Sequence, residues 1–209
     1  MRINEVVKHV LRPRRGIRPA FKRAHVVITL LKLLKEPIGR IALSRELGIG
    51  EASSRTLLNR LRELGIVKVD NVAGALLTSW GREVVEEFLN KVKLIGQIDL
   101  SDVFSDNISN YAGVIIDGIK NIESAGGVLK VRDLFVRYGA EGALILYYVD
   151  NELMMPLPRG YSRISKNTNY YRELMKMELR NGDAVLIAVC KEDSNKCMEI
   201  LIEVVLDLI

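Results

Sequence analysis

Apolar residues in the first part of the chain recur at the spacing of amphipathic helices. Leu57, Leu61 and Leu64 stand at i, i+4 and i+7, which predicts a helix from Glu51 to Leu64 with one buried stripe. Gly65 follows as a helix-ending residue, and the next residues, Ile-Val-Lys-Val-Asp, favour a strand. The same pattern predicts helices at 2–11, 20–36, 40–47 and 80–95 and two short strands at 66–70 and 75–79.

The polar side of the helix at 51–64 has an unusual composition. At 100° per residue, the face opposite the leucines holds Ala52, Arg55, Thr56, Asn59, Arg62 and Glu63. A solvated helix face is usually rich in Glu and Lys, whereas this one carries small, amide and guanidinium side chains. Two interpretations are open at this point: an ordinary solvated face, or a face that lies against a nucleic acid.

The charge distribution bears on that choice. The net charge of +5 divides into +10 for residues 1–95 (19 Lys/Arg, 9 Asp/Glu) and −5 for residues 96–209 (12 Lys/Arg, 17 Asp/Glu). Residues 1–25 alone hold eight basic side chains and one acidic side chain, Glu5. A basic half joined to an acidic half favours a polyanion as the partner of the first half, although accidental surface variation would give the same split.

The order helix, helix, turn, helix, strand, strand, helix resembles the winged helix-turn-helix family, in the manner of MarR-like and ArsR-like regulators. The resemblance rests on "ALSRELGIGEASSRTLLNRLRELGIV" and on "ALLTSWGREVVE", with a Leu-Thr-x-x-Gly signature at Leu77, Thr78 and Gly81. It implies a fold in which the helix at 51–64 enters the major groove of DNA and the two strands form a wing.

Candidate contacts follow from what each side chain can bind. Arg reads guanine and Asn reads adenine, while hydroxyl groups and basic side chains suit phosphates. We expect contacts to duplex DNA from the helix, the wing and a flexible basic arm that enters the minor groove or grips flanking phosphates. The residues are Ser53, Ser54, Arg55, Thr56, Asn59 and Arg62 in the helix, Lys68 and Asn71 in the wing, and Arg12, Arg14, Arg15 and Arg18 in the arm. Glu63 is expected to lie outside the groove, and the arm has a second interpretation as a tail bound to the acidic half of its own chain.

The second half predicts a separate α+β domain. Strands are expected at 111–118, 142–149, 152–155 and 184–190, and helices at 128–138, 169–180 and 195–208. This βαββαβα order predicts two layers, a single sheet with helices on one face. At most one of Tyr147 and Tyr148 would then be a core residue, since they point to opposite faces of their strand. The expected divisions are a basic helix and arm (1–19), a winged helix domain (20–95), a linker (96–108) and the α+β domain (109–209).

The architecture and the phrase "VRDLFVRYGAEGALILYY" resemble a group of archaeal two-domain proteins of unknown function. Their C-terminal domain is likened to the small inserted (GAD-like) domain of bacterial aspartyl-tRNA synthetases and tRNA-dependent amidotransferases. We expect this half to serve effector sensing or dimerisation. Arg132, Asp133 and Arg159 are candidate ligands for a small anionic effector, although ordinary helix capping explains the first two equally well.

Signals for catalysis, cofactors and membranes are missing from the sequence. It contains no P-loop, no GxSxG and no metal-type spacing of its two histidines, His9 and His25, or two cysteines, Cys190 and Cys197. A hydrophobic content of 48% without a secretory signal or spanning segment indicates a cytoplasmic protein with reduced thiols. We therefore predict a DNA-binding transcription regulator, dimeric by analogy with operator symmetry, without cofactor, metal or membrane partner, and not an enzyme. The alternatives are an RNA- or tRNA-associated binding protein and an enzyme with an accessory winged helix.

Overall fold

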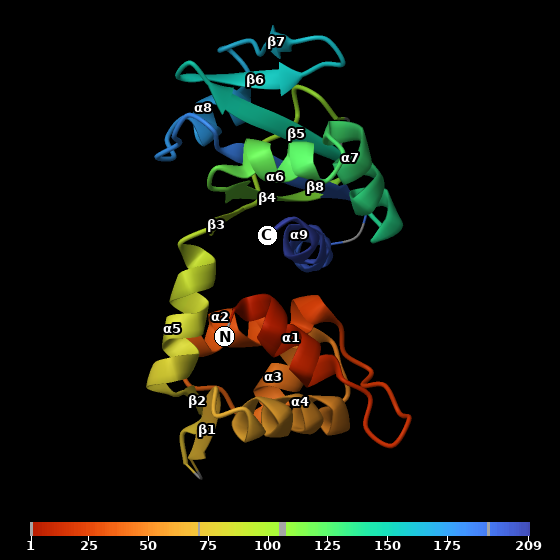
Figure 1. Ribbon diagram of the computed structural model, residues 1–209, viewed down its shortest axis with the longest axis vertical. Helices are drawn as coiled ribbons and strands as arrows, with labels where there is room; N and C mark the ends of the chain where they lie inside the picture. The colour runs from red at the N-terminus through yellow and green to blue at the C-terminus, as the bar shows by residue number, and fades with distance from the viewer. Residues whose placement is uncertain (1, 71, 105–107, 192) are drawn as a thin grey trace. The chain divides into compact units, whose positions relative to one another are not determined.

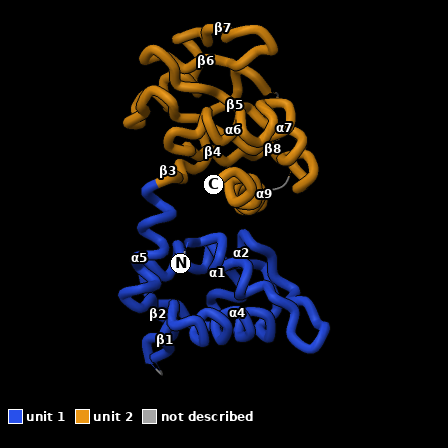
Figure 2. Tube along the Cα trace, viewed as in Figure 1, with its two compact units in different colours: residues 1–90 blue, residues 91–209 orange. Residues whose placement is uncertain are grey.

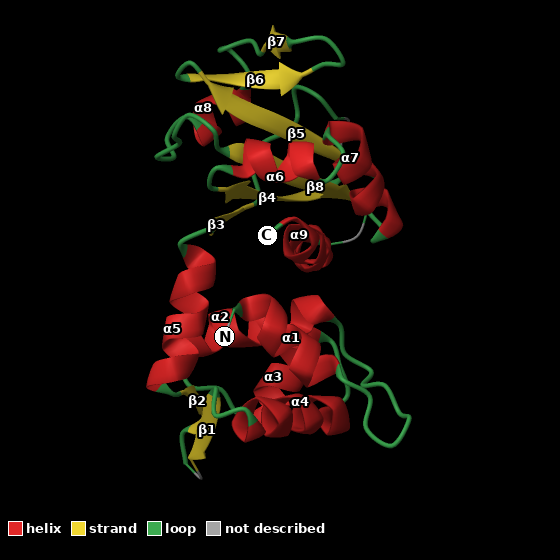
Figure 3. Cartoon of the chain, viewed as in Figure 1, coloured by secondary structure: helices red, strands yellow, loops and turns green. Residues whose placement is uncertain are grey.

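The computed structural model of the protein describes residues 2–70, 72–104, 108–191 and 193–209. They form two compact units, residues 1–90 and residues 91–209, which Figure 2 shows in separate colours. Figure 3 shows that the first unit is mainly helical and that the second is built on a sheet. None of the helices in the described ranges is long and apolar enough to cross a membrane.

Unit 1 contains five helices and one pair of strands among its described residues (Figure 1). These are α1 (Ile3–Leu11), α2 (Arg23–Lys35), α3 (Arg40–Leu47), α4 (Glu51–Glu63), β1 (Val67–Asp70), β2 (Gly74–Leu77) and α5 (Ser79–Leu89). The predicted helix at 51–64 is confirmed, and its Leu57 and Leu61 are fully buried. The predicted helix at 80–95 is too long, because α5 ends at Leu89 and a strand follows.

A tight turn joins α3 to α4. Gly48 ends α3 with a left-handed φ of 60°, a conformation that costs glycine nothing. The Ser44 hydroxyl donates a 2.7 Å hydrogen bond to the Ile49 carbonyl oxygen across this turn. The Ser54 hydroxyl donates to the Arg40 carbonyl oxygen at 2.9 Å, so the first turn of α4 is tied to the start of α3. These two hydrogen bonds hold the turn closed and join the two helices.

The strand pair is attached to the helices at both ends. Ile38 and Ala75 exchange two backbone hydrogen bonds of 3.1 and 2.9 Å, which join the segment just before α3 to β2. At the start of α5, the Gly81 amide donates to the Thr78 hydroxyl at 3.0 Å. A Cβ at Gly81 would lie 2.1 Å from the Ile66 carbonyl oxygen, so only glycine lets α5 begin this close to the strand pair. In the Leu-Thr-x-x-Gly signature, the threonine therefore caps α5, and the glycine allows the helix to approach the Ile66 backbone closely.

Unit 2 is a six-stranded antiparallel sheet with four helices among its described residues (Figure 1). Its elements are β3 (Val92–Gly96), β4 (Ser109–Ile115), α6 (Gly118–Ser124), α7 (Val128–Arg137), β5 (Gly142–Val149), β6 (Glu152–Pro156), β7 (Tyr161–Arg163), α8 (Asn169–Leu174), β8 (Ala184–Cys190) and α9 (Ser194–Leu208). The strand order is β3-β4-β8-β5-β6-β7. The four expected strands are present, whereas β3, β7 and α6 were not predicted.

Both faces of this sheet are covered, so the prediction of helices on one face is wrong. On one side, Val185 and Ile187 of β8 form a core with Leu174 and both tyrosines of α8. On the other side α9 packs against β4 and β8, and α7 packs against β5. Every residue of β8 is buried as a result. Tyr147 and Tyr148 are both buried, 1% and 8% exposed, which corrects the expectation that at most one of them is.

The boundary between the units also differs from the expected one. Helix α1 packs against α2, α4 and α5 and is an integral part of unit 1. Residues 96–108, expected to be a linker, contribute Ile98 and Leu100 to the core of unit 2. The Asn110 side chain holds this stretch in place through hydrogen bonds with the backbone of Ile98 at 3.0 and 2.9 Å.

Cys190 and Cys197 are joined by a disulfide that links the end of β8 to α9. The expectation of reduced thiols is therefore wrong for this structure. Both cysteines are buried, so the bond lies within the core of unit 2.

Candidate nucleic-acid interface

The outward face of α4 carries a stripe of polar side chains. Arg55, Asn59 and Arg62 fall within about 60° of arc at 100° per residue. Arg55 and Arg62 are exposed and Asn59 is half-buried. Within the described residues, Arg55 has no ion-pair partner. The stripe can therefore present one amide and two guanidinium groups to a ligand.

Hydroxyl groups at the start of α4 differ in what they can reach. Thr56 is exposed, and its hydroxyl donates to the Ala52 carbonyl oxygen at 2.8 Å within the helix. Ser53 is half-buried beside it. Ser54 is fully buried and bonded to α3, so the prediction that it contacts DNA is wrong. It holds the helix pair together instead.

The β1–β2 pair carries an exposed cation, Lys68, and β1 contacts α4. Lys68 is exposed and stands opposite Leu76 in the strand register. The turn between the strands begins at Asp70, whose carboxylate accepts hydrogen bonds from the Val72 and Ala73 amides at 2.8 Å. These bonds hold the pKa of Asp70 below its ordinary value. Asn71, the second predicted contact in this turn, lies outside the described residues.

The basic arm is a closed turn. Arg14 and Ile17 exchange two backbone hydrogen bonds of 3.1 and 3.0 Å, and Arg15 and Gly16 between them have left-handed φ values of 51° and 78°. Positive φ at both central residues is typical of the tight hairpin turn. Arg15 therefore sits at the tip of a small hairpin rather than in an open tail. Arg12 and Arg18 are exposed on its two sides.

Arg14 and Glu63 bind one another and fix the arm to α4. The Arg14 guanidinium donates to both carboxylate oxygens of Glu63. This pairing lowers the pKa of the Glu63 carboxyl, chiefly through the hydrogen bond, and raises the pKa of Arg14. Arg14, predicted to contact DNA, is thus already engaged by an acidic partner of its own unit.

Arg60 joins α4 to the end of α1 and the start of the arm, a role that the sequence did not predict. It is 6% exposed, and its Nη1 donates to the carbonyl oxygens of Val10 at 2.6 Å and Arg12 at 2.9 Å. Burial lowers the pKa of its guanidinium. A signal was present, because Arg60 follows Leu57 by three residues and therefore borders the apolar stripe.

Two surface hollows are lined by residues of both the arm and α4. One is lined by Arg14, Arg18 and Phe21 of the arm side and by Ala52 and Thr56 of α4, among others. The second lies at the other end of the helix, and four of its eight lining residues are arginines. It measures about 540 Å³ and is lined by His9, Arg12, Pro13, Arg14, Arg15, Arg60, Glu63 and Leu64.

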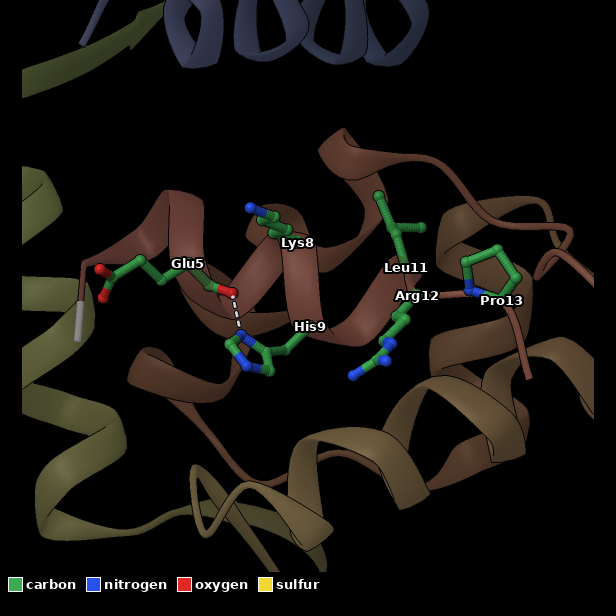
Figure 4. Close-up of a pocket in the computed structure, with 6 residues that line it drawn as sticks. All are labelled: Glu5, Lys8, His9, Leu11, Arg12 and Pro13. Atoms are coloured by element: carbon green, nitrogen blue, oxygen red, sulfur yellow. Dashed lines mark hydrogen bonds between the residues drawn. The ribbon is translucent and has the colours of Figure 1, made fainter.

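Figure 4 shows how α1 leads into the arm along a further surface hollow. His9 and Arg12 point to one side of α1, and Lys8 and Leu11 point to the other. The Nδ1 of His9 lies 2.9 Å from the Glu5 carbonyl oxygen, a geometry in which the ring nitrogen donates. The buried His25 accepts a hydrogen bond from the Lys22 amide at its Nδ1. Both imidazoles are thus engaged by backbone groups of their own helices.

The effector residues predicted in unit 2 lie on α7 and in the loop between β6 and β7. Arg132 and Asp133 are exposed neighbours on α7 that pair with each other at 3.1 Å. Arg159 is exposed in the loop between β6 and β7. A hollow beside this loop is lined by Tyr147, Tyr161 and Glu123 together with apolar residues, and none of the three predicted residues lines it. Within the described ranges, no three His, Cys, Asp or Glu side chains gather closely enough to hold a metal ion.

Comparisons with known proteins place the chain in a family. Residues 25–83 match the family described as "PH0730-like, N-terminal domain", and residues 107–208 match a domain of unknown function, DUF4443. A comparison with the curated proteins gives no significant match. The solved structure of the hypothetical protein PH0730 from Pyrococcus horikoshii OT3 is similar at a TM-score of 0.65 and 31% identity. The similarity covers 88% of this chain and 91% of that one, so the chain belongs to the PH0730-like family.

Proposed function

We propose that unit 1 is a winged helix-turn-helix domain and that the protein is a transcription regulator that reads duplex DNA with α4. The observation that supports this most is the stripe of Arg55, Asn59 and Arg62, with both guanidinium groups exposed and the amide half-buried, on the second of two helices joined by a tight turn. A helix of this kind fits the major groove, where Arg reads guanine and Asn reads adenine through paired hydrogen bonds.

In this proposal two small hairpins flank the reading helix. The β1–β2 pair acts as the wing and directs Lys68 to the phosphate backbone. The turn with Arg15 at its tip lies along α4 on the side of Thr56 and Arg60 and contacts flanking phosphates or the minor groove. Ser53, Thr56, Arg12 and Arg18 complete the proposed contact surface.

Unit 2 serves effector binding or dimerisation in the proposed function, and the chain acts in the cytoplasm without catalysis. Dimerisation is proposed because a pseudo-palindromic operator needs two reading helices.

The test is a competition between duplex DNA and tRNA across a salt series. Wild-type protein is mixed with genomic fragments of defined length and with bulk tRNA, and the retained fragments are sequenced. A regulator would retain a few fragments in the presence of excess tRNA, with log affinity falling at a slope of roughly −5 if about six phosphates are contacted. Stronger binding to tRNA would contradict the proposal and favour an RNA-associated function, which the likeness of unit 2 to tRNA-related inserted domains suggested.

A further inference from the structure

The second hollow beside α4, between the end of α1, the arm and the C-terminal half of the helix, has an excess of positive charge. Its walls contain four guanidinium groups against one carboxylate, that of Glu63. Burial and, after it, the nearby positive charge of Arg14 lower the pKa of Arg60. In the absence of a ligand, the repulsion between these guanidinium groups is offset only by the hydrogen-bond acceptors that the chain itself supplies.

The internal acceptors are incomplete. Arg60 lines this hollow and is more than nine-tenths buried. Its Nη1 is bonded to two carbonyl oxygens at the end of α1, but its Nε is buried and has no acceptor among the described residues. A buried donor without a partner is uncommon in native proteins, and here it leaves the positive charge of Arg60 only partly compensated by acceptors of the described residues. Of the cationic side chains in these walls, Arg14 alone has a carboxylate partner among the described residues.

The chemistry of the walls selects one class of ligand. The planar, forked donors of guanidinium groups match the oxygen geometry of phosphate, which accepts several charge-assisted hydrogen bonds at once. A volume of about 540 Å³ leaves room for a phosphate group and its neighbouring atoms. The carboxylate of Glu63 makes a forked interaction with Arg14 of the kind that a phosphate would make.

We propose that this hollow is a phosphate-binding site, in which Arg12, Arg15 and Arg60 supply donors and the incoming phosphate competes with Glu63 for Arg14. The proposal deepens the proposed DNA-binding function, because the phosphate can belong to the DNA backbone. It also stands without that function, because a small phosphorylated compound carries the same group. The site lies against α4, so occupancy would bear directly on the reading helix.

The test is calorimetric titration of the full chain with inorganic pyrophosphate, with chloride at matched ionic strength as the reference. Wild type is expected to bind pyrophosphate and to give no heat with chloride. Arg15→Gln is expected to bind about tenfold more weakly, since a hydrogen bond to a charged group is worth about that factor. Glu63→Gln is expected to bind about tenfold more tightly, because Arg14 is released. Arg45→Gln, which removes an exposed cation on α3 outside this hollow, is the matched control and should bind as wild type does.

The same variants separate the two sources of phosphate. If pyrophosphate displaces duplex DNA beyond the effect of ionic strength, the site holds a backbone phosphate. If pyrophosphate binds while DNA affinity is unchanged, its ligand is a free phosphorylated compound. Pyrophosphate binding with no DNA binding at all would leave the site standing and would overturn the proposed function. Binding no stronger than that of chloride, or an equal affinity in Glu63→Gln and Arg15→Gln, would overturn the site, provided that circular dichroism shows both variants folded.

Discussion

Arg60 of α4 donates a 2.6 Å hydrogen bond to the carbonyl oxygen of Val10, which lies fifty residues earlier in the chain. Helix α1 ends one residue later, at Leu11, and the arm begins there. A single buried guanidinium therefore ties the end of the first helix and the start of the arm to α4. The cation also suits the negative end of the α1 dipole.

Replacing Arg60 with methionine should destabilise unit 1 by about 2 to 3 kcal/mol, because the buried carbonyl oxygen of Val10 and the partly buried one of Arg12 lose a charged donor. The measurement is urea unfolding followed by circular dichroism. Arg55→Met, an exposed substitution on the same helix, is the control and should change the free energy of unfolding by less than about 0.5 kcal/mol. Equal effects of the two substitutions would show that Arg60 has no such structural role.

The Arg14–Glu63 pair predicts a defined pH dependence. Because the folded-state pKa of Glu63 is lowered, its stabilising contribution is complete above the unfolded value of about 4.3. The contribution is lost as the pH falls through the lower, folded-state pKa. The difference in unfolding free energy between wild type and Glu63→Gln should thus be present at neutral pH and vanish in acid. A difference that grows on acidification would contradict the assignment. At neutral pH, 1 M salt should reduce the difference in unfolding free energy between wild type and Glu63→Gln.

Gly81 should tolerate no larger residue. An alanine there would place its Cβ 2.1 Å from the Ile66 carbonyl oxygen, so α5 or the strand pair must shift. We expect Gly81→Ala to cost about 2 kcal/mol or more, measured as a lowered thermal midpoint. Gly142→Ala, where an added Cβ meets open space, is the matched control. Unchanged stability of Gly81→Ala would show that the close approach is not required.

Lys68 should contribute a phosphate contact and no sequence preference. Lys68→Ala is expected to weaken binding to all duplex fragments alike and to reduce the salt slope by about 0.9. The quantity to measure is the slope of log affinity against log salt for several unrelated fragments. Lys120→Ala, an exposed lysine of α6 in unit 2, should leave the slope as it is. A loss restricted to one fragment would assign Lys68 to base reading instead.

Local patterns predicted the elements of unit 1 well because its turns are made by local chemistry. Gly48 and the Ser44 hydroxyl close the turn before α4, and Asp70 caps the turn after β1. Each of these groups bonds to a residue no more than five positions away in the chain, so the spacing of residues in the sequence reveals the turn. Helix α5 was predicted too long because the residues after Asn90 continue the apolar pattern although the chain changes from helix to strand.

The features that escaped prediction depend on contacts between distant segments. From the sequence, Arg60 is one more polar residue of a helix. Its role depends on the end of α1, fifty residues earlier, where it bonds to the Val10 carbonyl oxygen. The second face of the sheet was missed although β8, read as Ala-Val-Leu-Ile-Ala-Val-Cys, is a continuous apolar run of the kind found in strands buried on both sides. Ser54 was assigned to DNA because its type suits phosphate, yet its spacing from Leu57 and Leu58 already placed it near the buried stripe.

The central claim, that α4 reads duplex DNA through the stripe of Arg55, Asn59 and Arg62, is tested most directly by one comparison of affinities. A genomic fragment selected by the wild type is titrated with wild type, with Arg55→Ala/Asn59→Ala and with Arg45→Ala at a fixed salt concentration. Each paired base contact is worth about 1 to 3 kcal/mol, so the double variant should lose roughly 100-fold or more in affinity while Arg45→Ala stays near wild type. Wild-type affinity of the double variant for the selected fragment would contradict the account.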